Sequence, residues 1–203
     1  MNNVFPDVAE YLKGTYQQVV GHLHATEQFG HFFHQPFVVI VNRVIISTEM
    51  LEAVFLLGQR PAQQPLTADE MRSRLTYLFR DMLFVGSMST MEYYLIQILM
   101  SCPHHPAHEA IQKKGGPRRV GLPDFMPWLQ DSALWEFAIQ FRNDAVHYNA
   151  VGRRTIPSPQ QLDFPIIVTE GQEAQGVLRS FVALTKALEM SYYNLLTSLS
   201  ASH

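Results

Sequence analysis

Apolar residues recur at helical spacing along most of this chain. The first such stretch covers residues 7–29, with apolar positions at Val8, Tyr11, Leu12, Tyr16, Val19, Val20 and Leu23. This spacing is that of an amphipathic helix. A second helix is predicted from Pro36 to Leu57, where Pro36 suits the first turn and Gly58 the end. Its β-branched start, Phe37 to Val41, would also suit a strand.

Three further helical stretches follow. Thr67 and Glu70 have capping-box spacing and predict a helix that continues to about Ser101. The next stretch runs from Pro123 to Tyr148 with a break near Asp131 and Ser132, either of which could cap a new helix. The last helix is predicted from Gln172 to about Ser200. The predicted connections are a loop at Gln59–Leu66, a long loop at Cys102–Leu122 and an irregular segment at Asn149–Gly171 with an extended piece at Phe164–Thr169.

The middle of the third helix is small and polar. It contains Gly86, Ser87, Ser89 and Thr90, so a backbone or a ligand could approach closely there. With four or five long helices and little strand signal, the chain is expected to be all-α. We expect one domain over residues 1–203, an up-down helical bundle with four core helices plus an additional N-terminal helix.

Composition limits the classes of function. A hydrophobic content of 47% and a charged content of 16% in 203 residues indicate a globular protein with an apolar surface suited to a partner. The net charge of −3 gives no global basic field, so any RNA-binding surface must be local. The single Cys102 excludes an internal disulfide and fits a reducing compartment.

No membrane or export signal is predicted. The first residues, Met1 to Asp7, have neither a basic nor an apolar signal region, and the longest apolar run, Phe37 to Val41, ends at Asn42 and is far too short to span a bilayer. We therefore expect a cytoplasmic protein without a membrane partner. No cofactor is predicted.

The segment Phe141–Asn149 carries the strongest chemical signal. Within it, Arg142 is followed directly by Asn143 and, five positions on, by His147, at the end of an aromatic-rich helix. A guanidinium offers a planar cationic fork for phosphate oxygens, and an imidazole transfers protons near neutral pH. This combination suits chemistry on a phosphodiester.

The Arg-Asn-x-x-x-His motif at the end of this helix resembles the hallmark of the HEPN superfamily of small helical proteins, with residues 36–200 as the corresponding core. The resemblance implies a homodimer in which both motifs line a shared cleft and cleave RNA without metal. His147 would act as general base on a ribose 2′-OH or as acid on the leaving oxygen, Arg142 would stabilise phosphate charge, and Asn143 would orient substrate or imidazole. Toxin or phage-defence roles, with an antitoxin or regulatory partner, are what the family suggests.

Three residues are assigned supporting roles. Asp144 and Tyr148 belong to the motif segment, and Glu92 on the preceding long helix could anchor Arg142 or be an ordinary interhelical ion pair. Many relatives place a tyrosine two residues after the histidine, as a site of modification by a partner nucleotidyltransferase. Here that position is Asn149 and Tyr148 directly follows His147, a departure that weakens the carry-over of this regulation.

Basic residues flank the motif helix on both sides. They are Lys113, Lys114, Arg118 and Arg119 before it and Arg153 and Arg154 after it. Such cationic loops could follow an RNA backbone, because phosphate contacts need charge rather than defined geometry. An exposed, solubilising loop is the alternative interpretation.

Four other hypotheses stay open. Arg142 and His147 could simply close the end of their helix. The protein could be a non-catalytic HEPN-type scaffold that binds nucleotide or RNA or dimerises, or a plain adaptor with a chance motif on an exposed face. A metal site is the fourth, drawn from Cys102, His104, His105 and His108, although Pro103 and Pro106 predict a loop there and no second pair of ligands completes it. His31 and His34 are interpreted as turn or interface residues.

Overall fold

The computed structural model describes residues 4–59, 67–160 and 162–200. Its α-helices are α1 (Val4–Thr26), α2 (His31–Gln59), α3 (Ala68–Tyr77), α4 (Gly86–Ser101), α5 (Pro106–Lys113), α6 (Leu122–Phe125), α7 (Ser132–Tyr148) and α8 (Leu178–Ser200). Short 3₁₀ turns lie at Glu27–Phe29, Pro117–Arg119 and Met126–Trp128, and a π-helical segment, η2, at Leu78–Val85. The described ranges contain isolated β-bridges but no strand. The all-α prediction is confirmed.

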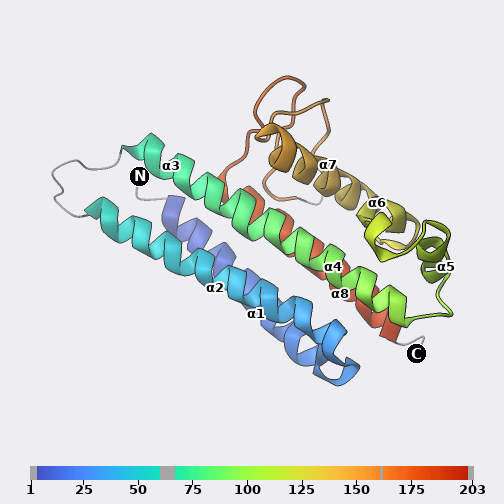
Figure 1. Cartoon of the computed structure of the whole chain (residues 1–203). Helices are drawn as coiled ribbons and strands as arrows, with labels where there is room; N and C mark the ends of the chain where they lie inside the picture. The colour runs from blue at the N-terminus through green and yellow to red at the C-terminus, as the bar shows by residue number, and fades with distance from the viewer. Residues whose placement is uncertain (1–3, 60–66, 161, 201–203) are drawn as a thin grey trace.

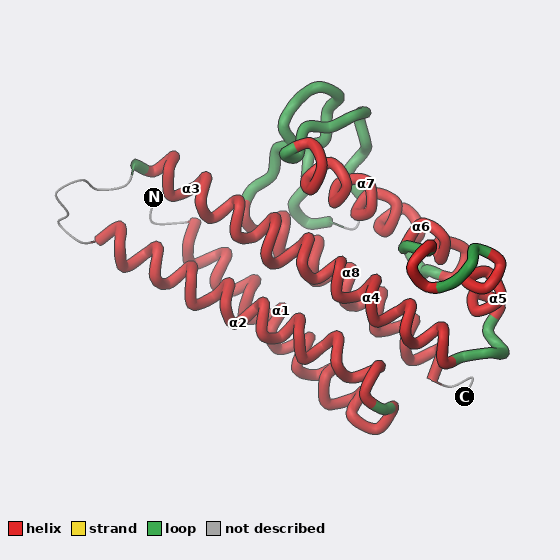
Figure 2. Tube along the Cα trace, viewed as in Figure 1, coloured by secondary structure: helices red, strands yellow, loops and turns green. Residues whose placement is uncertain are grey.

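The long helices lie side by side around one core. Figure 1 shows α1 and α2 as neighbours joined by a tight connection, with α3, η2 and α4 forming one continuous rod and α8 behind that rod. Helix α1 packs on α2 and α8, and α2 packs on α4 and η2. Helix α7 lies outside, against η2 and α8, and the segment after it forms the loops that stand above the rod (Figure 2).

A buried glutamate joins α1 to α8. Glu189 is fully buried, and its two carboxylate oxygens lie 2.7 Å from His22 Nδ1 and 2.5 Å from Gln18 Nε2. The ring of His22 also stacks on Tyr193, with centroids 3.8 Å apart. Because a buried carboxylate without partners would be very costly, these contacts fix the register of the two helices.

Aromatic packing sets the position of α7. Phe141 is fully buried and stacks between Phe84 of η2 and Phe181 of α8, at centroid distances of 5.3 and 6.1 Å. The buried Trp135 donates from Nε1 to Ser191 Oγ at 2.9 Å. The motif helix is therefore held against the rod and α8 along its buried side.

The small polar middle of the rod receives a side chain from α2. The Arg43 guanidinium lies so close to Gly86 that a Cβ there would be 2.2 Å from Nη1. The same Nη1 donates to the carbonyl oxygen of Met82, in the π segment, at 3.1 Å. Burial lowers the pKa of Arg43 from its ordinary value. The absence of a side chain at Gly86 thus leaves room for the close approach that the sequence indicated, and the approaching group is the end of an arginine side chain.

Helix boundaries differ most from the prediction at the starts of α2 and α8. Helix α2 begins at His31, so Pro36 lies inside the helix rather than in its first turn, and the helix runs one residue past Gly58. The final helix begins at Leu178 instead of Gln172, because the backbone just before it forms bridges, with Ala174 N donating to Ala150 O at 2.8 Å. Most of the predicted Gln59–Leu66 loop lies outside the described residues.

The predicted long loop at Cys102–Leu122 is wrong, because it contains α5. Pro106 occupies the first turn of this helix, where a missing N–H costs nothing. The imidazole of His105 accepts from Ala107 N at 3.2 Å as a cap, and Ala107 and Ile111 bury one face.

None of the described helices has the combination of length and apolarity that a membrane span requires.

Candidate functional site

The motif helix ends in a turn that leaves its histidine uninvolved. Asn149 and Ala150 adopt left-handed backbone angles, with φ of 50° and 63°. The N–H groups of both donate to the carbonyl oxygen of Asp144. Asparagine tolerates this conformation better than most residues. The helix is closed by these backbone bonds, so neither Arg142 nor His147 supplies the cap.

Arg142 is held in an ion pair with Glu92. Its Nη1 lies 2.5 Å from Glu92 Oε2, and its Nη2 donates to Asn143 Oδ1 at 3.3 Å. The other oxygen of Glu92 accepts from the N–H of Leu122 at 2.9 Å. These contacts join α4, the start of α6 and α7 at one point. The expected contact between Glu92 and Arg142 is present.

Asp144 anchors the other cation of this region. It is fully buried, and its Oδ1 accepts from Gln140 Nε2 at 3.1 Å and from Arg153 Nε at 2.9 Å. The Arg153 guanidinium also lies over the ring of Tyr148, 4.9 Å from its centroid. The hydrogen bond to Asp144 raises the pKa of Arg153. Arg153 is thus permanently charged and pinned to the last two turns of α7.

Arg154 turns back onto the same helix. Its Nη2 lies 3.3 Å from Gln140 Oε1 and 3.9 Å from Glu136 Oε1. The connection that follows α7 therefore returns both of its arginines to α7.

His147 stands exposed at the end of this arrangement. Its imidazole forms no hydrogen bond or ion pair with any residue in the described ranges, and it lies edge-on to the ring of Tyr148, with centroids 6.4 Å apart. Because α7 is regular through Tyr148, positions 142 and 147 are about 140° apart around the helix. Arg142 and His147 consequently do not share a face within one chain.

The face of His147 has its own cations. Positions 136, 140, 143 and 147 follow one another at helical spacing along a single face of α7. Arg154 folds over this face through Gln140 and Glu136, whereas Arg153 lies on the neighbouring face, with Asp144 and Tyr148. The sequence reasoning placed both arginines in an RNA-binding loop but missed Gln140 and Glu136, whose spacing before His147 was the available signal.

The remaining basic residues lie near the other end of α7. Lys113 pairs with Glu109 at 2.6 Å, and Lys114 pairs with Asp124. Arg118 and Arg119 are exposed and form no ion pair within the described residues. Figure 1 places α5 and α6, which flank these residues, at the end of α7 away from the loops that follow it. The structure does not bring this group to His147.

Two of the three histidines after α4, His105 and His108, bond to backbone groups at helix ends, and His104 is exposed. His105 caps α5, and burial lowers its pKa. His108 Nδ1 lies 3.1 Å from the carbonyl oxygen of Leu99. Within the described ranges, no group of three or more histidine, cysteine or acidic side chains has the arrangement of a metal site.

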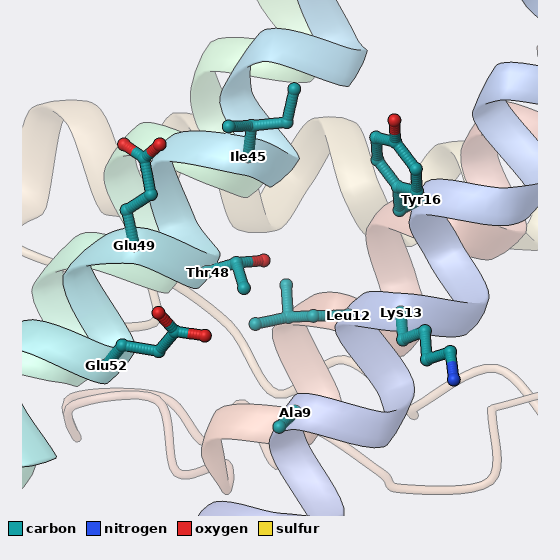
Figure 3. A pocket seen from close by; sticks show the side chains of 8 residues that line it. All are labelled: Ala9, Leu12, Lys13, Tyr16, Ile45, Thr48, Glu49 and Glu52. Carbon is teal, nitrogen blue, oxygen red and sulfur yellow. The ribbon is translucent and has the colours of Figure 1, made fainter.

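Among the cavities lined by the described residues, two have the size of a small-ligand site. One, of about 560 Å³, lies between α7 and the segment Arg154–Gln160. The other, of about 440 Å³, lies between α1 and α2, where Leu12 and Thr48 point toward each other and Glu49 and Glu52 stand on the α2 side (Figure 3). Only the first contains a residue of the predicted site, Arg154.

Comparisons with known proteins add no relative. No family model, no curated protein and no solved structure matches this chain.

Proposed function

We propose that this protein is a metal-independent endoribonuclease of the HEPN type, built on an up-down helical bundle. Its composite site is formed by two copies of the chain, and its role belongs with toxin or defence systems that an antitoxin or regulatory protein restrains. The observation that carries the proposal is His147. It is exposed, uninvolved in closing its helix, and adjacent to Tyr148, over which the Arg153 guanidinium lies.

The proposed reaction uses an internal nucleophile. His147 takes the proton from a ribose 2′-OH or delivers one to the departing 5′-oxygen. Arg153, held by Asp144 and lying over Tyr148, gives positive charge for the scissile phosphate on the neighbouring face of the same helix end. Asn143, on the same face as His147, orients the substrate or the imidazole, and Arg142 of the facing chain stabilises the phosphate, which supplies the geometry that one regular helix does not.

The proposed dimer would bring together two side chains that point away from each other in one chain, Arg142 and His147. Two copies related by a two-fold axis would place Arg142 of one chain opposite His147 of the other, twice. Exposed apolar side chains next to the motif, Val146 and Tyr148, would be covered by the same contact.

Subunit mixing tests the composite site directly. The variants Arg142→Ala and His147→Ala should each be inactive, yet co-expressed chains should regain activity, because half of the sites in each mixed dimer contain both wild-type residues. About a quarter of wild-type cleavage is expected at equal expression. Light scattering on the wild-type chain should give a dimer. A monomer, or no recovery on mixing, contradicts the composite site.

One observation favours the non-catalytic scaffold as a second candidate. The guanidinium of Arg142 already forms an ion pair with Glu92 and a hydrogen bond with Asn143. A phosphate would therefore have to compete with the Glu92 carboxylate for this guanidinium. A dimer that binds RNA but does not cleave it would support the non-catalytic scaffold. A monomer without affinity for RNA would support the third hypothesis, an adaptor protein in which the motif arose by chance.

A further inference from the structure

The concavity beside α7 has the composition of a site for a flat, polar-edged ring. Its apolar walls come from Phe137 and from Ile156, Pro157 and Pro159 of the connection after α7. Phe137 is buried, so that wall is fixed by the core. A volume of about 560 Å³ lies within the range of small-ligand sites.

Two charged groups stand at the rim of this cavity. Glu136 is largely exposed, with 70% of its side chain accessible, and Arg154 lies 3.9 Å from it. The Arg154 side chain also contacts Gln140, one turn closer to His147. The rim thus presents the Glu136 carboxylate as a hydrogen-bond acceptor, next to Arg154, which extends from Glu136 to Gln140 in the direction of His147.

The cavity and His147 are aligned on one helix. Positions 136 and 147 share a face of α7 and are eleven residues apart, which is about 16 Å along the axis. A few nucleotides of a single strand cover this length. Arg154 lies along this face on Glu136 and Gln140, and Arg153 lies beside it on Asp144 and Tyr148, so both could meet the strand's phosphates.

We propose that this cavity binds a guanine base of the RNA, a few nucleotides away from the phosphate at His147. The inference rests on the proposed function, because it takes RNA as the ligand. The accessible Ile156 and Pro157 would pack on a face of the base, as apolar groups do for unstacked bases in single strands, over a floor formed by the buried Phe137 and Pro159. Glu136 would accept from the base edge.

The carboxylate selects guanine among the four bases. Guanine presents two neighbouring donors on its Watson–Crick edge, N1–H and the N2 amino group, which together match both oxygens of a carboxylate. Cytosine, adenine and uracil present one donor group each. A carboxylate that is left without these donors loses a charge-assisted pair, so the preference should be large.

Binding of uncleavable RNA tests this site separately from cleavage. The probes are labelled 2′-O-methyl octamers, which lack the nucleophile: all uridine, uridine with one guanine, and uridine with one inosine, which has no N2 amino group. Fluorescence anisotropy on the wild-type dimer should show about tenfold tighter binding of the guanine octamer than of the uridine octamer, with inosine between them.

Three variants complete the test. Glu136→Gln should remove the guanine preference and keep the affinity for uridine, and Ala133→Phe, which puts a ring into the cavity from an exposed position, should do the same. Glu27→Gln is the matched control, since it removes an exposed carboxylate at 62% accessibility far from α7, and it should keep the preference.

Equal binding of all octamers by the wild type, or a full guanine preference in Glu136→Gln, overturns the guanine site while RNA binding stands. Absence of any RNA binding overturns both this site and the proposed function.

Discussion

Arg142 and Glu92 are fifty residues apart in the sequence and 2.5 Å apart across the contact of α7 with α4. Both side chains are mostly buried, at 15% and 22% accessibility. The same carboxylate also accepts from the N–H of Leu122. One acidic side chain therefore fixes the motif arginine and the start of α6 together, and removal of its charge should affect stability as well as activity.

Glu92→Gln should destabilise the protein by about 1–3 kcal/mol, because Arg142 loses its charged partner in a poorly solvated place while the amide oxygen can still accept from Leu122. Urea denaturation measures this change. The control is Glu109→Gln, which removes an exposed i,i+4 pair with Lys113 and should cost less than about 0.5 kcal/mol. Equal effects of the two variants would mean that the Arg142 pair contributes no more than a surface pair.

Gly152→Ala should loosen the segment that carries Arg153 and Arg154. A Cβ at this position would lie 2.7 Å from the backbone oxygen of Thr169, so the chain must move apart there. A loss of about 1–3 kcal/mol is expected in thermal or urea unfolding.

The matched control is Gly21→Ala in α1, where nothing lies within 4 Å of the added carbon. This change should stabilise the protein by up to about 1 kcal/mol through helix propensity. A stabilised Gly152→Ala variant would contradict the close approach at Thr169.

His147→Ala should lower the cleavage rate by about 10²–10⁴-fold and leave the melting temperature unchanged, because the side chain is exposed and transfers a proton without supporting the fold. Single-turnover cleavage and thermal unfolding check the two parts. His104→Ala, which removes another exposed histidine, should cleave at the wild-type rate. The same loss in both variants would move the chemistry away from the motif.

Arg142→Lys should cleave about 10²-fold more slowly, because an ammonium cannot reproduce the two-point phosphate contact of a guanidinium. Arg179→Lys is the control, an arginine that also pairs with a carboxylate, Asp7 at 3.4 Å, on a different part of the surface. If Arg142→Lys and His147→Ala both remain folded dimers and cleave at the wild-type rate, the nuclease assignment is wrong.

Cleavage should continue in EDTA, because arginine and histidine supply both charge stabilisation and proton transfer in the proposed reaction. The 5′ product should end in a 2′,3′-cyclic phosphate, since the nucleophile is the adjacent 2′-OH. Mass spectrometry of the products and a chelator titration test these points. Activity that disappears with EDTA and returns with Mg²⁺ or Mn²⁺ would assign the chemistry to a metal site instead.

Local signals predicted part of this fold well. The capping box of Thr67 and Glu70 forms as expected, with Glu70 N donating to Thr67 Oγ1 at 3.2 Å. The helix break at Asp131 is present too, in a left-handed conformation. Both depend on residues within a few positions of each other. Helix α5 was not predicted because a proline breaks a helix when it lies inside it but is favourable in the first turn. Which of the two applies to Pro106 depends on whether the following residues pack on the core, as the buried Ile111 does.

The site shows the same division. Its residue types and the link from Glu92 to Arg142 could be predicted from the motif and its neighbours. The contact of Arg153 with Asp144 could not, because it depends on how the connection after α7 folds back, and backbone bonds such as Gly152 N to Gln172 O decide this. The spacing along α7 already separates Arg142 from His147, but only the folded chain shows that Arg154 contacts Gln140 and Glu136, on the face of α7 that carries His147.

The π-helical segment η2 determines which way α4 faces. Its wider turn takes up more residues than an α-helical turn, so everything after Val85 is rotated relative to an uninterrupted α-helix. One residue corresponds to about 100° of rotation. Deleting a residue within Leu78–Val85 would therefore swing Glu92 away from α7 without altering any residue of the motif. The position of Glu92, and with it the orientation of Arg142, therefore depends on a segment that ends about two helical turns before Glu92 in the chain.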